Sequence, residues 1–245
     1  WLGGALIGSL HYIVPSLLKT DLHSGRLGAM SAWVWNVALV LNLALIWTGI
    51  PGNLLLSVRP YEYAEQPLLV NILITLATVL AIYNIHRTFL ARRSEGVYVS
   101  VWYLIMGLYL TAFAYVVISF IEPFVFKGVG SQVIQAWWLH NAVGLFITPL
   151  GVGLLYFVIP MAAGSPLYSH RLSLIGFWTL MAFYPIVGVH HFLQAPVPTW
   201  INEVAVIFSI LLIIPVLAVV INFLATPGTN WRRLIDSYPL RFALL

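Results

Sequence analysis

The chain has 245 residues, of which 61% are hydrophobic and only 7% are charged. Its mean hydropathy of +0.97 lies far above the range of soluble domains, which excludes a soluble globular protein and predicts an integral membrane protein. The absence of cysteine excludes disulfides, thiolate metal sites and thiol catalysis. The formal net charge of +4 needs no nucleic-acid partner, because the basic residues lie in short loops between apolar stretches.

Apolar stretches long enough to cross a bilayer as helices recur along the whole chain. They are continuously apolar rather than alternating, which argues against a membrane β-barrel. We therefore expect an all-α, polytopic transmembrane helix bundle, with residues 1–245 forming a single transmembrane domain. The expected spans are 1–18, 28–50, 67–90, 98–126, 137–161, 171–192 and 203–225, and a further helix begins near Tyr238. The first stretch is already apolar at Trp1, so we interpret the chain as an interior part of a longer polypeptide.

Lysine and arginine are concentrated in alternate loops. The loops after the first, third, fifth and seventh spans contain most of them, namely Lys19, Arg26, Arg87, Arg92, Arg93, Arg171, Arg232, Arg233 and Arg241. The other loops contain only Arg59 and Lys127. The positive-inside rule therefore predicts that the first set is cytoplasmic, and that Trp137 and Phe192 lie at the outer ends of their spans.

Three histidines lie near the outer ends of the spans 137–161 and 171–192, namely His140, His190 and His191. Each lies within about two helical turns of the outer surface, so the three imidazoles can converge. Isolated histidines at a membrane interface need no special role, but polar groups within spans are costly and usually have a functional partner. Imidazole is a common ligand of copper, zinc and iron, and three ligands leave a coordination position open. We predict a catalytic transition-metal site.

Adjacent residues of a regular helix point about 100° apart, so His190 and His191 can share one ion only if the helix is loosened or the ion lies in the notch between them. Pro185 removes a backbone donor and Gly188 adds backbone freedom. Tyr184 lies two turns before His191 on nearly the same face, where it is either a packing residue or a partner of the site. Thr148 lies eight residues after His140; its hydroxyl can pass protons or simply bond its own backbone.

The stretches WWLHNAVGLFIT, YFVIPMAAGSPLYSHRLSLIGFW and YPIVGVHH resemble the sixth and seventh helices of haem-copper oxidase subunit I. The resemblance is strongest to the C-family, or cbb3-type, cytochrome c oxidases. It extends from the motif EYAE at 62–65 to the loop before Arg241, and therefore covers essentially the whole chain. It implies that the chain is an interior part of a twelve-helix fold.

The resemblance also implies roles for individual residues. His140, His190 and His191 match the ligands of the copper ion, copper B. Tyr184 matches the active-site tyrosine, which in the family is joined covalently to the sixth-helix histidine. Thr148 matches a residue of the family's proton pathway.

Glu62 matches a ligand of the calcium ion that bridges the haem propionates in the family, although an exposed loop carboxylate is more often only solvated. The family also binds a high-spin and a low-spin haem b, and the matching haem ligands are expected outside this segment. This chain contains no H-x-H pair, and the remaining histidines do not match haem-ligand positions: His11, His23, His86 and His170.

The implied function is the reduction of dioxygen to water in a terminal respiratory oxidase, coupled to proton uptake and pumping. Electrons are expected from c-type cytochrome subunits on the outer side of a bacterial inner membrane, and membrane lipids surround the bundle.

Two alternatives stay open. Nitric oxide reductase keeps three similar histidines but binds iron with a carboxylate four residues after the sixth-helix histidine and has a glutamate eight residues after it. This chain has Gly144 and Thr148 there, and no Asp or Glu between Trp137 and Phe192. Imidazoles without a carboxylate favour copper, so the oxidase is preferred. A non-catalytic membrane scaffold or transporter subunit, whose histidines line a cavity, is the other alternative.

Overall fold

The computed structural model describes residues 2–228 and 232–244, and every regular element within these ranges is helical. The predicted all-α class is therefore confirmed. The elements are α1 (Leu2–Leu18), α2 (Gly25–Thr48), α3 (Leu68–Leu90), α4 (Val99–Val116), η1 (Val117–Ile121), α5 (Glu122–Val125), α6 (Val129–Asn141), η2 (Ala142–Ile147), α7 (Thr148–Ala163), α8 (His170–Phe183), η3 (Tyr184–Phe192), α9 (Thr199–Leu211), α10 (Ile213–Ala225), α11 (Arg233–Asp236) and α12 (Tyr238–Leu244).

Six continuous helical segments are long and apolar enough to cross a membrane, and α1 is a shorter apolar helix. These seven segments correspond to the seven expected spans. The largest boundary difference is at the span expected from 137, which begins at Val129. Hydropathy misses this start because Ser131 and Gln135 are polar, but both side chains bond a buried carboxylate of the preceding segment.

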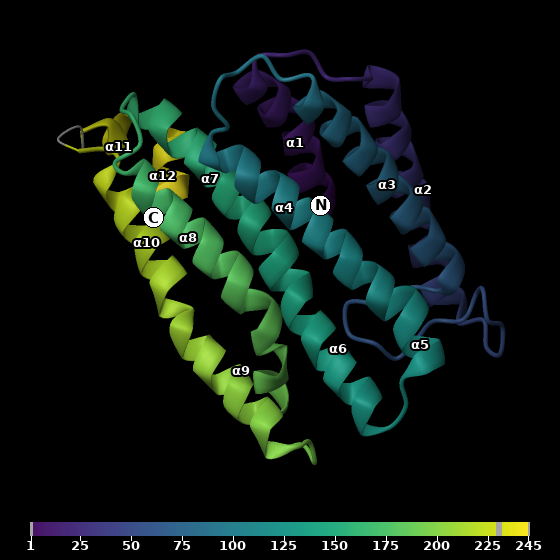
Figure 1. Cartoon of the computed structure of the whole chain (residues 1–245). Coiled ribbons are helices and arrows are strands. Elements are labelled where there is room, and N and C mark those ends of the chain that lie inside the picture. Colours follow the sequence, from purple (N-terminus) through teal and green to yellow (C-terminus); the bar gives the residue numbers. More distant parts are fainter. Residues whose placement is uncertain (1, 229–231, 245) are drawn as a thin grey trace.

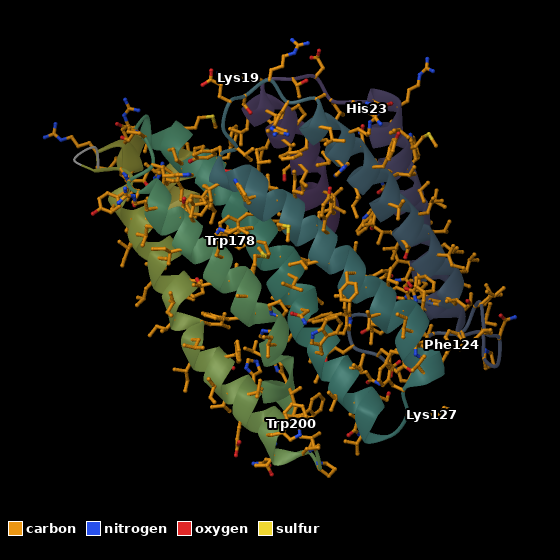
Figure 2. The ribbon with its side chains drawn as sticks, in the orientation of Figure 1. Lys19, His23, Phe124, Lys127, Trp178 and Trp200 are labelled. Atoms are coloured by element: carbon orange, nitrogen blue, oxygen red, sulfur yellow. The ribbon has the colours of Figure 1, made fainter. Side chains whose placement is uncertain are left out.

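The helices form an up-and-down bundle in which α4 and α7 pack together at the centre (Figure 1). On one side of this pair lie α1, α2 and α3, and on the other side lie α8, α9 and α10. Lys19 and Lys127 lie at opposite ends of the bundle (Figure 2), as the alternation of basic loops requires. The large apolar side chains of α9 and α10 are mostly exposed, which suits contact with lipid.

The two hydrophobic clusters with the most buried residues join the central pair of helices to its neighbours. The first joins α1, α3, α4 and α7 around Leu10, Ile85, Leu104 and Leu150. The second joins α4, α7, α8 and α10, where the buried rings of Tyr103, Tyr156, Phe177 and Phe223 contact one another.

At the starts of α2 and α8, a serine and a buried asparagine of another helix exchange two hydrogen bonds. The amide of Ser24 donates to Asn84 Oδ1, and Asn84 Nδ2 donates back to the Ser24 carbonyl. Ser169 and Asn222 exchange the same two hydrogen bonds. Each serine also caps its helix through its hydroxyl, so one buried asparagine fixes the start of a neighbouring span in both halves of the bundle.

Three stretches within the spans depart from α-helical geometry. Val117–Ile121 and Ala142–Ile147 are π-helical, whereas Tyr184–Phe192 is a 3₁₀ helix. Such departures change the direction in which later side chains point and often mark functional positions. Two of the three lie directly beside the predicted histidines.

Candidate metal centre

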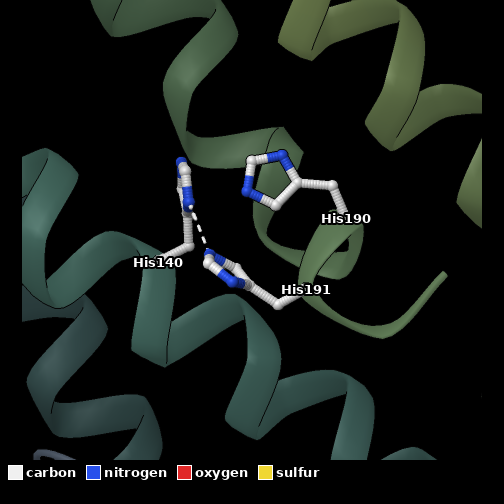
Figure 3. A group of neighbouring side chains, drawn as sticks. All are labelled: His140, His190 and His191. Carbon is white, nitrogen blue, oxygen red and sulfur yellow. Dashed lines mark hydrogen bonds between the residues drawn. The ribbon is translucent and has the colours of Figure 1, made fainter.

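The structure brings His140, His190 and His191 together at one end of the bundle (Figure 3). Each residue contributes one ring nitrogen, and these nitrogens all lie within 4.8 Å of one another. His140 is buried, His190 is half-buried and His191 is exposed. No fourth potential ligand of the His, Cys, Asp or Glu type joins this group among the described residues.

The spacing of the nitrogens suits a shared ion. His140 Nδ1 and His191 Nε2 are 3.2 Å apart. Two ligands at metal–nitrogen distances of about 2.0–2.1 Å and a tetrahedral angle are separated by about 3.3 Å. A transition-metal ion therefore fits between these atoms without a change in the backbone, and the neutral imidazole set with no carboxylate suits copper.

The segment η3, a 3₁₀ helix, carries the two adjacent histidines near its end. It begins with Tyr184 and Pro185, and it contains Gly188 just before the pair. A Cβ at Gly188 would lie 2.6 Å from Trp137 Cα and 2.9 Å from the Ala136 carbonyl oxygen, so only glycine permits this close approach to α6. The helix departs from regular α-helical geometry around Pro185 and Gly188, as expected, but it does so as a tighter 3₁₀ helix rather than a loosened one.

Tyr184 lies directly against His140. The two rings are stacked with centroids 4.3 Å apart and planes inclined by 27°. The tyrosine ring also occupies the space beside Gly144, where any added Cβ would overlap it. His140 uses Nδ1 to face His191. Its other ring nitrogen, Nε2, is buried and has no hydrogen-bond partner among the described residues.

Thr148 lies close to the Tyr184 phenol. In a regular α-helix, residues eight apart differ by about 80° in direction. The π-helical segment Ala142–Ile147 lies between His140 and Thr148, and a π turn takes up an extra residue. This shift brings Thr148 to the face of the helix that carries His140.

Glu62, the predicted calcium ligand, does not lie in the histidine group. It is an exposed loop residue, and the structure brings it into no group of three or more potential metal ligands within the described ranges. Its assignment to calcium stays a prediction.

A buried carboxylate that the sequence did not single out lies nearby. Glu122 is fully buried and accepts hydrogen bonds from Ser131 and Gln135. Burial, followed by the hydrogen bond to Glu122, raises the pKa of the Tyr61 phenol in the connection between α2 and α3. Hydropathy gives no signal for this residue; the proline that follows it, at the end of an apolar run, is the only local hint.

Comparison with known proteins places these residues in a family. The family model described as cytochrome c and quinol oxidase polypeptide I matches residues 1–245. The cbb3-type cytochrome c oxidase subunit CcoN1 of Stutzerimonas stutzeri is 28% identical over 99% of this chain and 51% of its own length. A cytochrome c oxidase subunit 1 homolog of Azorhizobium caulinodans is 32% identical over 95% of this chain and 42% of its own length.

Cytochrome c oxidase subunit 1 of Rhodobacter capsulatus is 29% identical over 99% of this chain and 46% of its own length. The chain thus spans about half the length of the relatives it matches. The family match, the helical bundle and the histidine group agree with the resemblance expected from the sequence. The chain belongs to the cytochrome c and quinol oxidase polypeptide I family, which is subunit I of the haem-copper oxidases.

Proposed function

We propose that this chain provides the copper-binding part of the catalytic subunit of a cbb3-type terminal oxidase, which reduces dioxygen to water. The observation that carries the proposal is the meeting of three imidazoles from α6 and η3, with Tyr184 stacked on one of them. A membrane protein rarely places a polar group within a span without a functional partner.

His140, His190 and His191 would hold copper B, with His140 Nδ1 and His191 Nε2 as two of the three ligand atoms. When bound, copper and a neighbouring high-spin haem supply the redox and Lewis-acid chemistry of dioxygen reduction. The three imidazoles bind as neutral donors, so the site needs no charged side chain of its own in the apolar part of the bundle.

Tyr184 would hold a proton and donate it at the phenol oxygen, beside His140. Thr148, which lies close to the phenol, would deliver the replacement proton. Thr148 has no ionisable group, so it passes a proton only by accepting one and releasing another at the same oxygen. This arrangement would give protons an oriented route to the phenol.

The contact between Tyr184 and Gly144 supports an oxidase rather than a nitric oxide reductase. A carboxylate four residues after His140 would have to grow from Gly144, where even a Cβ would overlap the tyrosine ring. The tyrosine and an additional carboxylate ligand are therefore mutually exclusive in this arrangement of helices. The hydroxyl of Thr148, in place of a second carboxylate, keeps the site neutral.

The remaining parts of the proposal follow the family. A low-spin haem b, the haem ligands and c-type cytochrome subunits would come from outside this segment. Proton uptake would occur from the cytoplasmic side of a bacterial inner membrane, with the metal centre near the outer side and with proton pumping coupled to turnover. Glu62 would contribute to a calcium site only together with groups from outside this chain.

Optical spectroscopy of the purified complex tests the proposal. A reduced-minus-oxidised spectrum with b-type haem bands, a carbon monoxide shift and one copper per histidine group are expected, together with oxygen consumption. A complex without haem absorbance would support a scaffold or transporter subunit instead. Iron in place of copper, with nitric oxide consumption, would support the reductase.

A further inference from the structure

Ser209 of α9 contacts one of the three histidines directly. Its Oγ lies 2.7 Å from His190 Nδ1. Serine is an unexpected residue in this position, because α9 and α10 form the most apolar of the candidate spans. Its side chain is half-buried against η3 rather than turned fully to lipid.

The direction of this hydrogen bond is fixed by a second contact. Ser209 Oγ also lies 2.6 Å from the carbonyl oxygen of Ala205, one turn earlier. A carbonyl oxygen only accepts, and a serine hydroxyl has one proton to donate, so that proton lies between Ser209 and Ala205. The Ser209 oxygen is therefore an acceptor toward His190, and His190 must carry its own proton on Nδ1.

A neutral imidazole has one protonated nitrogen and one free lone pair, and the partner of the first decides which nitrogen can bind a metal. With Nδ1 protonated, the lone pair of His190 is on Nε2. Figure 3 shows that one ring nitrogen of His190 is turned toward His140, on the side of the ring that faces the other two histidines. We propose that Ser209 is a positioning residue that fixes His190 in the Nδ1–H tautomer and so makes Nε2 its copper-binding atom.

Two further contacts fix the position of α9, and therefore of Ser209, against the neighbouring segments. Asn202 Nδ2 donates to the carbonyl of Leu193, just after η3. One residue before Ser209, the ring of Phe208 packs edge-on against Phe183, with centroids 5.7 Å apart. Asn202 and Ser209 are two helical turns apart and lie on one face, so α9 presents a polar face to η3 in a fixed register.

This inference rests on the proposed copper site, and it assigns to α9 a role at a centre whose ligands all come from α6 and η3. Partners of the outer nitrogen of a ligating histidine orient the ring and increase its basicity, and their loss typically weakens metal binding by about 10–100-fold.

The test uses Ser209→Val and Ser209→Thr in the intact oxidase complex, because valine and threonine have the same shape and differ only in the hydroxyl. Copper retention is measured by elemental analysis during titration with a copper(I) chelator. We expect Ser209→Val to weaken copper binding by about 10–100-fold, and Ser209→Thr to stay near the wild type. Thr179→Val, which removes the same kind of bond to a carbonyl one turn earlier in α8, should leave copper binding unchanged.

Equal copper affinity of Ser209→Val and the wild type would overturn the inference, and so would an equal loss in the threonine and valine variants. Haem absorbance checks assembly; if the valine variant does not assemble, the smaller Ser209→Ala decides by the same criterion. A wild-type complex that has haem but binds no copper would instead overturn the proposed function, so the two failures are distinguishable.

Discussion

The ring of Tyr184 occupies the space that a side chain on Gly144 would need. This contact couples two segments that are far apart in the sequence, because a glycine in η2 is required for a tyrosine in η3 to stack on His140. Any residue other than glycine at position 144 must displace the tyrosine or separate the helices.

Gly144→Ala is therefore expected to lower both activity and stability. Overpacking by a methyl group typically costs about 1–3 kcal/mol, and the Tyr184 ring is the nearest group that can move. Oxygen consumption and thermal unfolding of the purified complex measure the two effects. Gly151→Ala is the control, because a Cβ there meets nothing within 4 Å. Normal activity of Gly144→Ala would contradict the assigned position of the Tyr184 ring.

Tyr184→Phe keeps the ring and removes only the hydroxyl. We expect copper and haem contents to be unchanged, while turnover falls by about 10²-fold or more, because a positioned proton donor is lost. Tyr168→Phe makes the same chemical change at an exposed position away from the site and should be silent. Retained turnover in Tyr184→Phe would remove the phenol from the mechanism.

Thr148→Val removes the hydroxyl that neighbours the Tyr184 phenol and preserves the branched shape. Proton delivery should slow, and turnover should fall by a smaller factor than in Tyr184→Phe, because the phenol itself remains. Thr148→Ser should recover most of the rate. Steady-state oxygen consumption, compared in light and heavy water, is the measurement; the same rate and isotope effect in the valine variant and the wild type would count against this route.

His140→Ala and His191→Ala each remove one of the two nitrogens that lie 3.2 Å apart. Both variants are expected to lose copper while haem remains, as measured by elemental analysis. His86→Ala is the matched control, since His86 is exposed and its Nδ1 contacts only the Tyr109 hydroxyl. Full copper content in either test variant would falsify the ligand set.

Glu122→Leu should destabilise the protein without changing the metal site directly. The substitution removes the acceptor that half-buried Ser131 and Gln135 share, and losing a hydrogen bond typically costs about 0.5–1.5 kcal/mol. Thermal unfolding followed by haem absorbance measures the loss, with the exposed Glu203→Leu as the reference. An unchanged unfolding temperature would show that the carboxylate adds no net stability.

Much of the fold could be predicted because membrane helices are specified by length and hydropathy alone. A departure from α-helical geometry at Pro185 and Gly188 was also predictable, because proline and glycine have known effects on the backbone, although its form, a tighter 3₁₀ helix, was not. The π-helical segment Ala142–Ile147 was not predictable, because it contains neither proline nor a polar residue. Its position depends on packing against η3, which hydropathy does not report.

Some features of the candidate site could be predicted from the sequence, and others could not. The convergence of His140, His190 and His191 followed from depth and sidedness, which are one-dimensional properties of the sequence. Ser209 and Glu122 were missed because their importance depends on which neighbour they touch, and a single polar residue in a span gives no direction. The overlap between Gly144 and the Tyr184 ring likewise becomes visible only when two distant segments are placed side by side.

The π-helical segment also restricts how this protein can change in length. Because a π turn takes up one extra residue, removing one residue from Ala142–Ile147 would restore a regular helix and keep Thr148 on the face that carries His140. Inserting a further residue that the helix takes up regularly would instead turn everything after it by about 100° and rotate Thr148 away from the phenol. Single-residue insertions there should abolish turnover, whereas insertions in the exposed connection between η3 and α9 should be tolerated. Segment length, as much as residue identity, is under constraint at this point of the chain.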